Sequence, residues 1–533
     1  MILKAIALFC GITFSQVGFG SQLIENFTSR THLDFGTAVW NQELGRIHPT
    51  LQVAGYNGAA TPIDFSVGDG SDGPFDTTTY ASFSSGGDVS GNIIRLDTSV
   101  HPLLQVTHFY LAPGWSIQPV GNNQIIIESL SYVDIQGEIW CHGFDGGNAS
   151  GTTPGVAGAG RCGGTSGGAG GAVASGGSNG STVSVSPAVT GGKAGSYSGV
   201  PVGGGGGGSW NTTIAAGNGP NFSGANGQGG LSNSDPSFQN LNGASGGGGG
   251  SGDATDAGGG GGGGGGLVMI FAVGDVSVGS SPSSSTGFIY VNGGKGGNGS
   301  GSAAPGGGGG GGSVRIAAGG TIHLYNTNGS GAVQALGGAA GTNGSSSLTG
   351  ATGAGGRSWL SANAYDYVGS YDPTEQSPIV AGQVQYSTAN EYVDTVAVDM
   401  GDNTAQILSM AVTPSSADFT ITLGGSDDNF VSDDTGFTTD VNVVSHKRYI
   451  RMEISITAST PTVMSSGEIS QATVDYTGGA VQTQLNNFQF QAAGCGRVDD
   501  VSTPKMNMLL LLLTPMLLMA MKLRKASLFL PEA

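Results

Sequence analysis

The chain has 533 residues, of which 103 are glycine and only 10 % are charged. Its 36 acidic residues outnumber 17 basic ones, and a net charge of -19 would repel phosphate backbones, which excludes nucleic-acid binding. The composition is unlike that of ordinary globular enzymes, and the irregular glycine spacing with an ordinary proline content argues against a collagen triple helix.

Residues 1–20 have the features of a secretory signal peptide. Lys4 provides a positive start, residues 6–14 form a short apolar stretch, and Gly18 and Gly20 are the small residues expected before cleavage at Ser21. The sequence therefore predicts an exported protein.

Residues 21–124 have an ordinary composition and predict an N-terminal β region that caps the repeats beginning at residue 125. A Pro-Gly turn precedes Trp115 and Ile117, and residues 125–127 are three consecutive isoleucines typical of a buried strand.

Three stretches further along share one spacing of apolar residues, six positions and then two. Such short units cannot bury their own apolar faces, but stacked copies can. The aligned residues are Ile127, Val133 and Ile135; Ile270, Val276 and Val278; and Ile316, Ile322 and Leu324, with Ile139, Ile289 and Val333 following in turn.

This repeat predicts an all-β protein with a right-handed parallel β-helix, or β-solenoid, over residues 125–361. The unequal spacing of the units makes the glycine-rich blocks 143–266 and 293–313 insertions that leave the corners of the stack.

Long runs of glycine recur inside these blocks. Bare backbone in an extended threefold conformation can pair laterally where side chains would prevent it, so we expect the runs to pack against one another beside the β-helix. A disordered glycine brush is the alternative, because glycine loses the most conformational entropy on ordering. The runs are 203–208, 246–250, 258–266 and 306–312.

The phrases VDIQGEIWCHGFDGG (133–147) and GGGGGGGSVRIAAGGTI (306–322) resemble those of uncharacterised glycine-rich bacterial secreted and surface proteins, which have β-helix-like repeats and a C-terminal sorting tail. The resemblance implies a place at the cell surface and implies no activity.

Residues 365–480 return to normal glycine content and predict an antiparallel β-sandwich. HKRYIRMEISITAST (446–460) and SGEISQATVDYTG (466–478) resemble the closing strands of discoidin-like and related carbohydrate-binding sandwiches. Strands are expected at 384–386, 392–398, 405–412, 419–423, 448–456 and 471–476.

The cysteines and the C-terminal segment fit an exported protein. A disulfide between Cys141 and Cys162 would close a short loop. Cys495 is left over in a linker, residues 481–505, and is a candidate for lipid attachment or processing. Residues 506–525 combine an apolar stretch with a basic end. They predict either a membrane anchor or a sorting tail cut by a protease or transpeptidase.

Clustered aspartates predict a calcium site, with solvated acidic turns as the alternative. The candidate ligands are Asp427, Asp428, Asp433 and Asp434, with further acidic turns at Asp69 and Asp72 and at Asp399 and Asp402. The tryptophans are candidate sugar-stacking platforms or core residues: Trp40, Trp115, Trp140, Trp210 and Trp359.

No acidic pair recurs in the repeats, since Ser277 and His323 replace Asp134 in the later units, although Glu138 and Asp145 lie nearby. We therefore expect a non-enzymatic protein of the bacterial cell surface, either an adhesin that contacts glycans or another cell, or an extracellular scaffold. A polysaccharide-degrading enzyme and a matrix spacer without a ligand are the alternatives.

Overall fold

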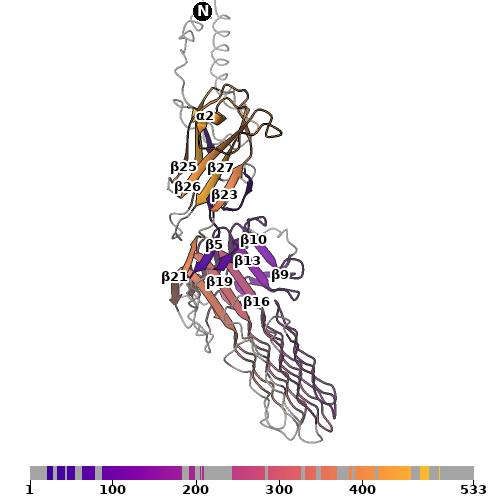
Figure 1. Ribbon diagram of the computed structural model, residues 1–533. Helices are drawn as coiled ribbons and strands as arrows, with labels where there is room; N and C mark the ends of the chain where they lie inside the picture. Colours follow the sequence, from indigo (N-terminus) through magenta and orange to yellow (C-terminus); the bar gives the residue numbers. More distant parts are fainter. Residues whose placement is uncertain are drawn as a thin grey trace, which may run out of the picture.

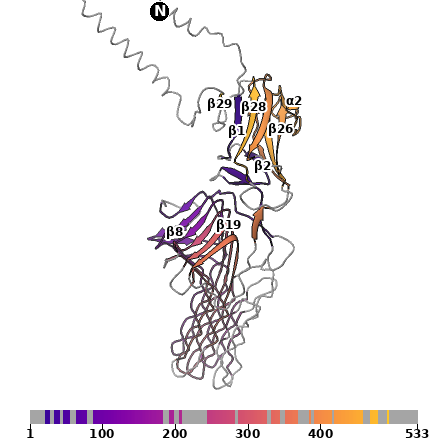
Figure 2. The same cartoon turned by 90° about the vertical axis from the view of Figure 1, so that its left-hand side faces the viewer.

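A computed structural model describes most of the chain between residues 21 and 492, and the predicted signal peptide, Cys495 and the hydrophobic tail lie outside it. The described residues are 21–27, 33–41, 45–54, 63–78, 87–182, 191–197, 205, 207–208, 243–281, 286–325, 331–343, 350–368, 383–386, 390–414, 418–457, 468–478 and 491–492. Figures 1 and 2 show two antiparallel sheets at one end, a parallel sheet in the middle, and glycine-rich chains at the other end.

The centre of the molecule is a parallel sheet whose strands have the order β10-β13-β16-β19-β17-β14-β11-β7, with β21 also paired to β19. Its strands are β7 (Phe75–Asp76), β10 (Leu103–Val106), β11 (Phe109–Leu111), β13 (Ile125–Ser129), β14 (Val133–Ile135), β16 (Leu267–Ala272), β17 (Val276–Val278), β19 (Ser313–Tyr325) and β21 (Arg357–Val368). All these pairings are parallel.

The register of this sheet confirms the repeat alignment. Ile127 pairs with Ile270, which pairs with Ile316. The later positions of the repeat, from Val133 to Leu324 and from Ile139 to Val333, are paired in the same way. Side chains at these positions are buried in one continuous core, because successive residues of a strand face opposite sides of the sheet.

The all-β class is confirmed, but the right-handed parallel β-helix predicted for residues 125–361 is wrong. The parallel strands form one nearly closed, barrel-like sheet. The joining element is β19, whose 13 residues pair with β16 at one end and with β17 at the other. This one long strand links two rows of strands that the repeat treats as separate faces.

A second sheet, of order β20-β18-β15-β12-β9-β8, lies against the same core, which includes Ile139, Ile289 and Val333. Its neighbours are parallel except for β8 and β9, which pair antiparallel. The strands are β8 (Gly87–Ser90), β9 (Ile93–Leu96), β12 (Ser116–Ile117), β15 (Glu138–Trp140), β18 (Phe288–Tyr290) and β20 (Val333–Gln334).

Two antiparallel sheets enclose a separate core. They contain strands from both the beginning and the end of the described chain. One has the order β25-β28-β1-β29, and the other β2-β23-β27-β24 with β26 beside β27. The elements are β1 (Ser21–Glu25), β2 (Leu33–Gly36), β23 (Asn390–Thr395), β24 (Val398–Asp399), β25 (Gln406–Thr413), β26 (Phe419–Ser426), α2 (Val441–Val444), β27 (Tyr449–Thr457), β28 (Gln471–Thr477) and β29 (Gln491–Ala492). We call this unit the sandwich; β1 lies between β28 and β29, so residues next to the predicted signal peptide complete it.

A small sheet covers the outer face of the parallel sheet, where Trp359 is 2 % exposed. The guanidinium of Arg315 lies 3.9 Å from the centre of the Trp359 ring and 5.1 Å from that of Phe271. The strands of the small sheet are β5 (Leu51–Ala54), β6 (Ile63–Phe65) and β22 (Gln383–Tyr386), and β3 (Val39–Asn41) pairs nearby with β4 (Arg46–His48).

The glycine-rich segments pack side by side into what we call the glycine bundle, as predicted. The run 258–266 is its inner chain. Each of its backbone N–H groups donates to a neighbouring segment at 2.7–3.0 Å, and residues three apart donate to the same segment. The three acceptor segments are 141–147, 165–171 and 304–310, and its carbonyl groups accept from 155–158, 244–250 and 294–297. A period of three matches an extended threefold helix, and six neighbours surround the inner chain.

The inner chain must be glycine because its neighbours leave no room for a side chain. A Cβ atom at Gly262 would lie 2.0 Å from the carbonyl oxygen of Gly294, and one at Gly261 would lie 2.1 Å from that of Gly247. The glycine run is therefore a packed structural element.

On the outside of the bundle, side chains replace missing neighbours. The side-chain oxygen of Asp145 accepts from the backbone nitrogen of Lys295 at 2.8 Å, and that of Asn148 accepts from Asn298 at 2.8 Å. The side chain of Asn298 in turn accepts from the backbone nitrogen of Thr342 at 2.9 Å. These side chains satisfy backbone donors that would otherwise lack a chain to pair with.

The predicted disulfide between Cys141 and Cys162 is formed, with 5.5 Å between the Cα atoms, and both residues are buried. Gly266 donates to the carbonyl of Cys141, and Leu267 donates to that of Cys162. The bridge therefore clamps the point at which the inner glycine run becomes strand β16.

Candidate functional site

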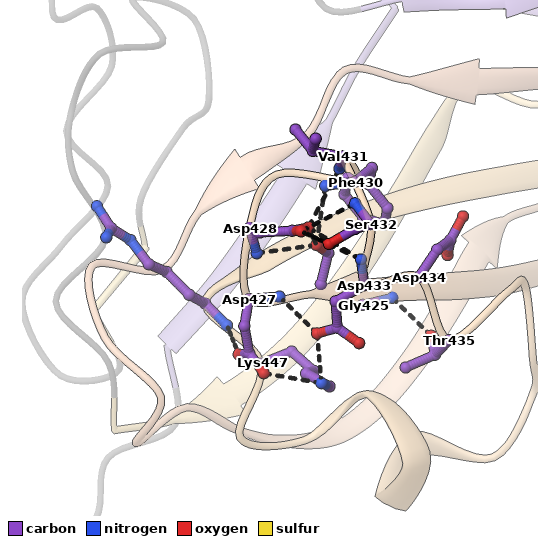
Figure 3. Close-up of polar contacts among 12 residues, drawn as sticks. Gly425, Asp427, Asp428, Phe430, Val431, Ser432, Asp433, Asp434, Thr435 and Lys447 are labelled. Carbon is purple, nitrogen blue, oxygen red and sulfur yellow. Dashed lines mark hydrogen bonds and ion pairs between the residues drawn. The ribbon is translucent and has the colours of Figure 1, made fainter.

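The four aspartates predicted to bind calcium lie in one loop of the sandwich, after β26 (Figure 3). The Asp428 carboxylate is enclosed by the loop, and hydrogen bonds to it, first of all from the Ser432 hydroxyl at 2.6 Å, hold its pKa well below the usual range. Its other donors are the backbone nitrogens of Val431, Ser432 and Asp433 and the Ser426 hydroxyl.

The remaining carboxylates of the loop pair with cations of the chain itself. Lys447 Nζ lies 2.8 Å from Asp427 Oδ2 and 2.7 Å from Asp433 Oδ2, so it occupies the place between them (Figure 3). Asp434 pairs with Arg451 at 2.9 Å. Within the described residues no group of three or more His, Cys, Asp or Glu is arranged to hold a metal. Three of the four carboxylates are thus paired within the chain, by two cations, and calcium binding by this loop stays a prediction.

A cavity of about 390 Å³ lies where the sandwich meets the parallel sheet, and we call it the junction cavity. Its walls come from β2, from β3, from the segment after β6, and from β10. Its polar and aromatic lining residues are Asp34, Trp40, Ser66, Asp69 and Gln105.

The loop GDGSDGP (68–74) is fixed to β10 at the edge of this cavity. The backbone nitrogen of Gln105 donates to Asp72 Oδ2 at 2.8 Å, and the nitrogen of Asp72 donates to the Gln105 carbonyl at 2.9 Å. Gly68 has a φ of +74°, and a Cβ atom there would lie 3.1 Å from the side chains of Gln105 and Glu128. Asp72, one of the acidic-turn residues, therefore anchors this loop.

Side chains in the cavity are held by partners behind them. Trp40 Nε1 donates to the Phe27 carbonyl at 2.6 Å, which fixes the indole ring. Glu128 Oε2 accepts from Gln105 Nε2 at 3.2 Å and from the Ser66 hydroxyl at 3.3 Å. Burial raises the pKa of Glu128, an effect that the hydrogen bonds from Gln105 and Ser66 oppose. The cavity thus presents preorganised groups.

The other described tryptophans have different settings. Trp115 packs against the core of the parallel sheet, and Trp359 lies beneath the small sheet. Trp140 Nε1 donates to Glu138 Oε2 at 2.6 Å on the outer face of β15. Trp210 lies outside the described residues.

The carboxylates considered for a hydrolytic site are engaged separately. Asp134 accepts from Gln136 Nε2 at 2.8 Å, and burial raises the pKa of Asp134. Glu138 accepts from Trp140, while Asp145 accepts from the backbone of Lys295. The described contacts give these three carboxylates no shared partner.

Comparisons with known proteins leave the chain without an assigned relative: no family model, no curated protein and no solved structure matches it. Within the described part of the chain, no helix is both long enough and apolar enough to cross a membrane.

Proposed function

We propose that this chain is a non-enzymatic protein of the bacterial cell surface, in which the glycine bundle is a rigid stem used for adhesion or as an extracellular scaffold. The observation that carries the proposal is the inner chain 258–266, which is hydrogen-bonded to six neighbouring segments. A stem built from paired backbone keeps its shape without a hydrophobic core.

The arrangement of the ends supports an outward-pointing stem. Strand β1 begins where the signal peptide is expected to be cut, and β29 precedes the predicted hydrophobic tail. Both strands belong to the sandwich, and the glycine bundle extends from the opposite side of the parallel sheet (Figures 1 and 2). A membrane anchor after β29 would hold the sandwich near the cell and place the bundle away from it. Surface glycans or another cell are the partners that we propose.

The test is hydrogen exchange on the full chain, combined with a cell-adhesion assay. Amides of residues 257–266 should exchange slowly, because each of them donates to another segment. Cells that carry Gly262→Asp should lose adhesion together with this protection, while Lys295→Asp, at an exposed position of a neighbouring segment, should retain both. Exchange at random-coil rates in the unaltered protein would rule out a rigid stem.

A further inference from the structure

We infer that the junction cavity binds an uncharged sugar unit of a surface glycan, an inference that rests on the proposed contact function and names its ligand class. The volume of about 390 Å³ lies within the range of roughly 300–1,000 Å³ of small-molecule sites, which occur preferentially between domains.

The first element of such a site is an aromatic platform. Trp40 lines the cavity, is partly buried against the sandwich core, and has its indole nitrogen satisfied by the Phe27 carbonyl. A sugar ring presents an apolar face of C–H groups that packs on an indole ring. Because the ring is already fixed, little side-chain entropy is lost when the sugar binds.

The second element is a set of hydrogen-bond acceptors suited to hydroxyl groups. Asp34 and Asp69 bring carboxylates to the cavity, and Gln105 adds an amide. Gln105 Nε2 uses one N–H on Glu128, which leaves its carbonyl oxygen and a second N–H to meet a ligand. Sugar hydroxyls donate to acceptors of this kind, and such charge-assisted hydrogen bonds are strong.

The charge of the site selects among sugars. Asp34 and Asp69 line the cavity, Glu128 lies behind it, and the whole chain has a net charge of -19. A uronic or sialic acid would be repelled, which leaves uncharged hexoses and N-acetylhexosamines. A cationic amine is the competing ligand, because carboxylates and a tryptophan ring attract ammonium groups.

The inference is tested by titrating the full chain with methyl β-glucoside, methyl β-galactoside and N-acetylglucosamine, with calorimetry and tryptophan fluorescence as readouts. Glucuronic acid and putrescine are the charged comparison probes. We expect at least one uncharged sugar to bind with little dependence on salt, and glucuronic acid to bind at least tenfold more weakly.

The variants locate the site. Trp40→Ala should weaken sugar binding at least tenfold, whereas Trp140→Ala, on the outer face of β15, should leave it unchanged. Because Trp40 also packs on the sandwich core, Asp34→Asn and Gln105→Ala provide a second test, and each should weaken binding severalfold. Asp34→Asn, at an exposed side chain, should also leave the thermal unfolding profile unchanged. Unchanged affinity in these two variants would overturn the inference.

Other results would also overturn it: no binding of any uncharged sugar, or binding of putrescine alone with suppression by salt. The outcome is separable from that of the rigid stem. If the glycine bundle shows no amide protection but sugar binding still depends on Trp40, the rigid stem is wrong and the sugar site stands. If the bundle is protected but no sugar binds, the stem stands and the sugar site is wrong.

Discussion

The backbone nitrogen of Gly261 donates a 2.7 Å hydrogen bond to the carbonyl oxygen of Gly168, although neither residue has a side chain to guide the contact. The residues on either side of Gly261 donate to different segments, Gly260 to Gly147 and Gly262 to Gly307. The absence of side chains is what permits this, because three neighbours must approach within three residues of chain.

The first prediction concerns the inner chain. Gly262→Ala would place a methyl group 2.0 Å from the Gly294 carbonyl oxygen, and neither backbone can move without breaking its other hydrogen bonds. We expect a loss of about 3 kcal/mol or more in unfolding free energy. Thermal unfolding measures the loss of stability, and hydrogen exchange over residues 243–266 shows whether it is local to the bundle. Lys295→Ala is the matched control and should change stability by less than about 0.5 kcal/mol; equal effects would contradict the packing described.

The second prediction concerns the clamp at the root of the bundle. The disulfide Cys141–Cys162 has a sequence separation of 21, and losing such a bridge costs about 3 kcal/mol in the chain-entropy description. Reductant, or Cys141→Ser with Cys162→Ser, should lower the melting temperature of the bundle and speed amide exchange at Gly266 and Leu267. The sandwich, which contains neither cysteine, should melt as before. A sandwich that is equally destabilised would show that the effect is not local.

The third prediction is a pH dependence of the sandwich. Asp394 lies opposite Glu453, and its buried Oδ1 accepts no hydrogen bond from the described residues. Burial raises the pKa of Asp394 to about 6, and the Glu453 charge adds to this. The folded state therefore holds a proton that the unfolded state releases, so the free energy of unfolding falls as pH rises from about 4 to about 6. The loss should be about 1–2 kcal/mol, because solvent screens the group.

Asp394→Asn should abolish this slope and raise the melting temperature at neutral pH. Urea unfolding of the full chain at several pH values, monitored through the sandwich transition, measures it. Glu453→Gln should reduce the slope in part, since the Glu453 charge is the second cause of the raised pKa. An unchanged slope in Asp394→Asn would assign the effect to another group.

The fourth prediction concerns the aspartate loop. Lys447 pairs with both Asp427 and Asp433, and its hydrogen bond to Asp433 lowers the pKa of Asp433. The chelator EDTA should therefore leave the sandwich melting temperature unchanged. Lys447→Met removes the ammonium group and should create a measurable affinity for calcium, seen by calorimetry. Calcium binding by the unaltered loop would contradict the ion pairs described.

Sequence reasoning succeeded where a pattern had a single physical meaning. The spacing that aligned Ile127, Ile270 and Ile316 also predicted that these residues pair across neighbouring strands. A shift of one residue in the strand register would turn their side chains out of the core. Bare glycine backbone likewise predicted lateral packing, and the cysteine spacing predicted the disulfide.

It failed where the outcome depended on how distant segments meet. Strand β19 joins two rows of strands into one sheet, and nothing in its sequence, SVRIAAGGTIHLY, marks the absence of a turn at Gly319 and Gly320. The ion pairs of the aspartate loop were also missed, because Lys447 comes from the segment before β27 and not from the loop itself. The junction cavity was missed for the same reason, since Trp40, Asp69 and Gln105 come from separate elements.

The threefold period of the inner chain also limits how the gene can change. Gaining or losing one codon within 258–266 would turn every later glycine toward a different neighbour, while a change of three codons restores the phase. We therefore expect the packing to accept length changes of this run in steps of three residues, or nine nucleotides. Each step would add one turn, about 9 Å, provided that the surrounding segments lengthen together. The stem can thus evolve in length only by discrete increments shared among several distant stretches of the gene.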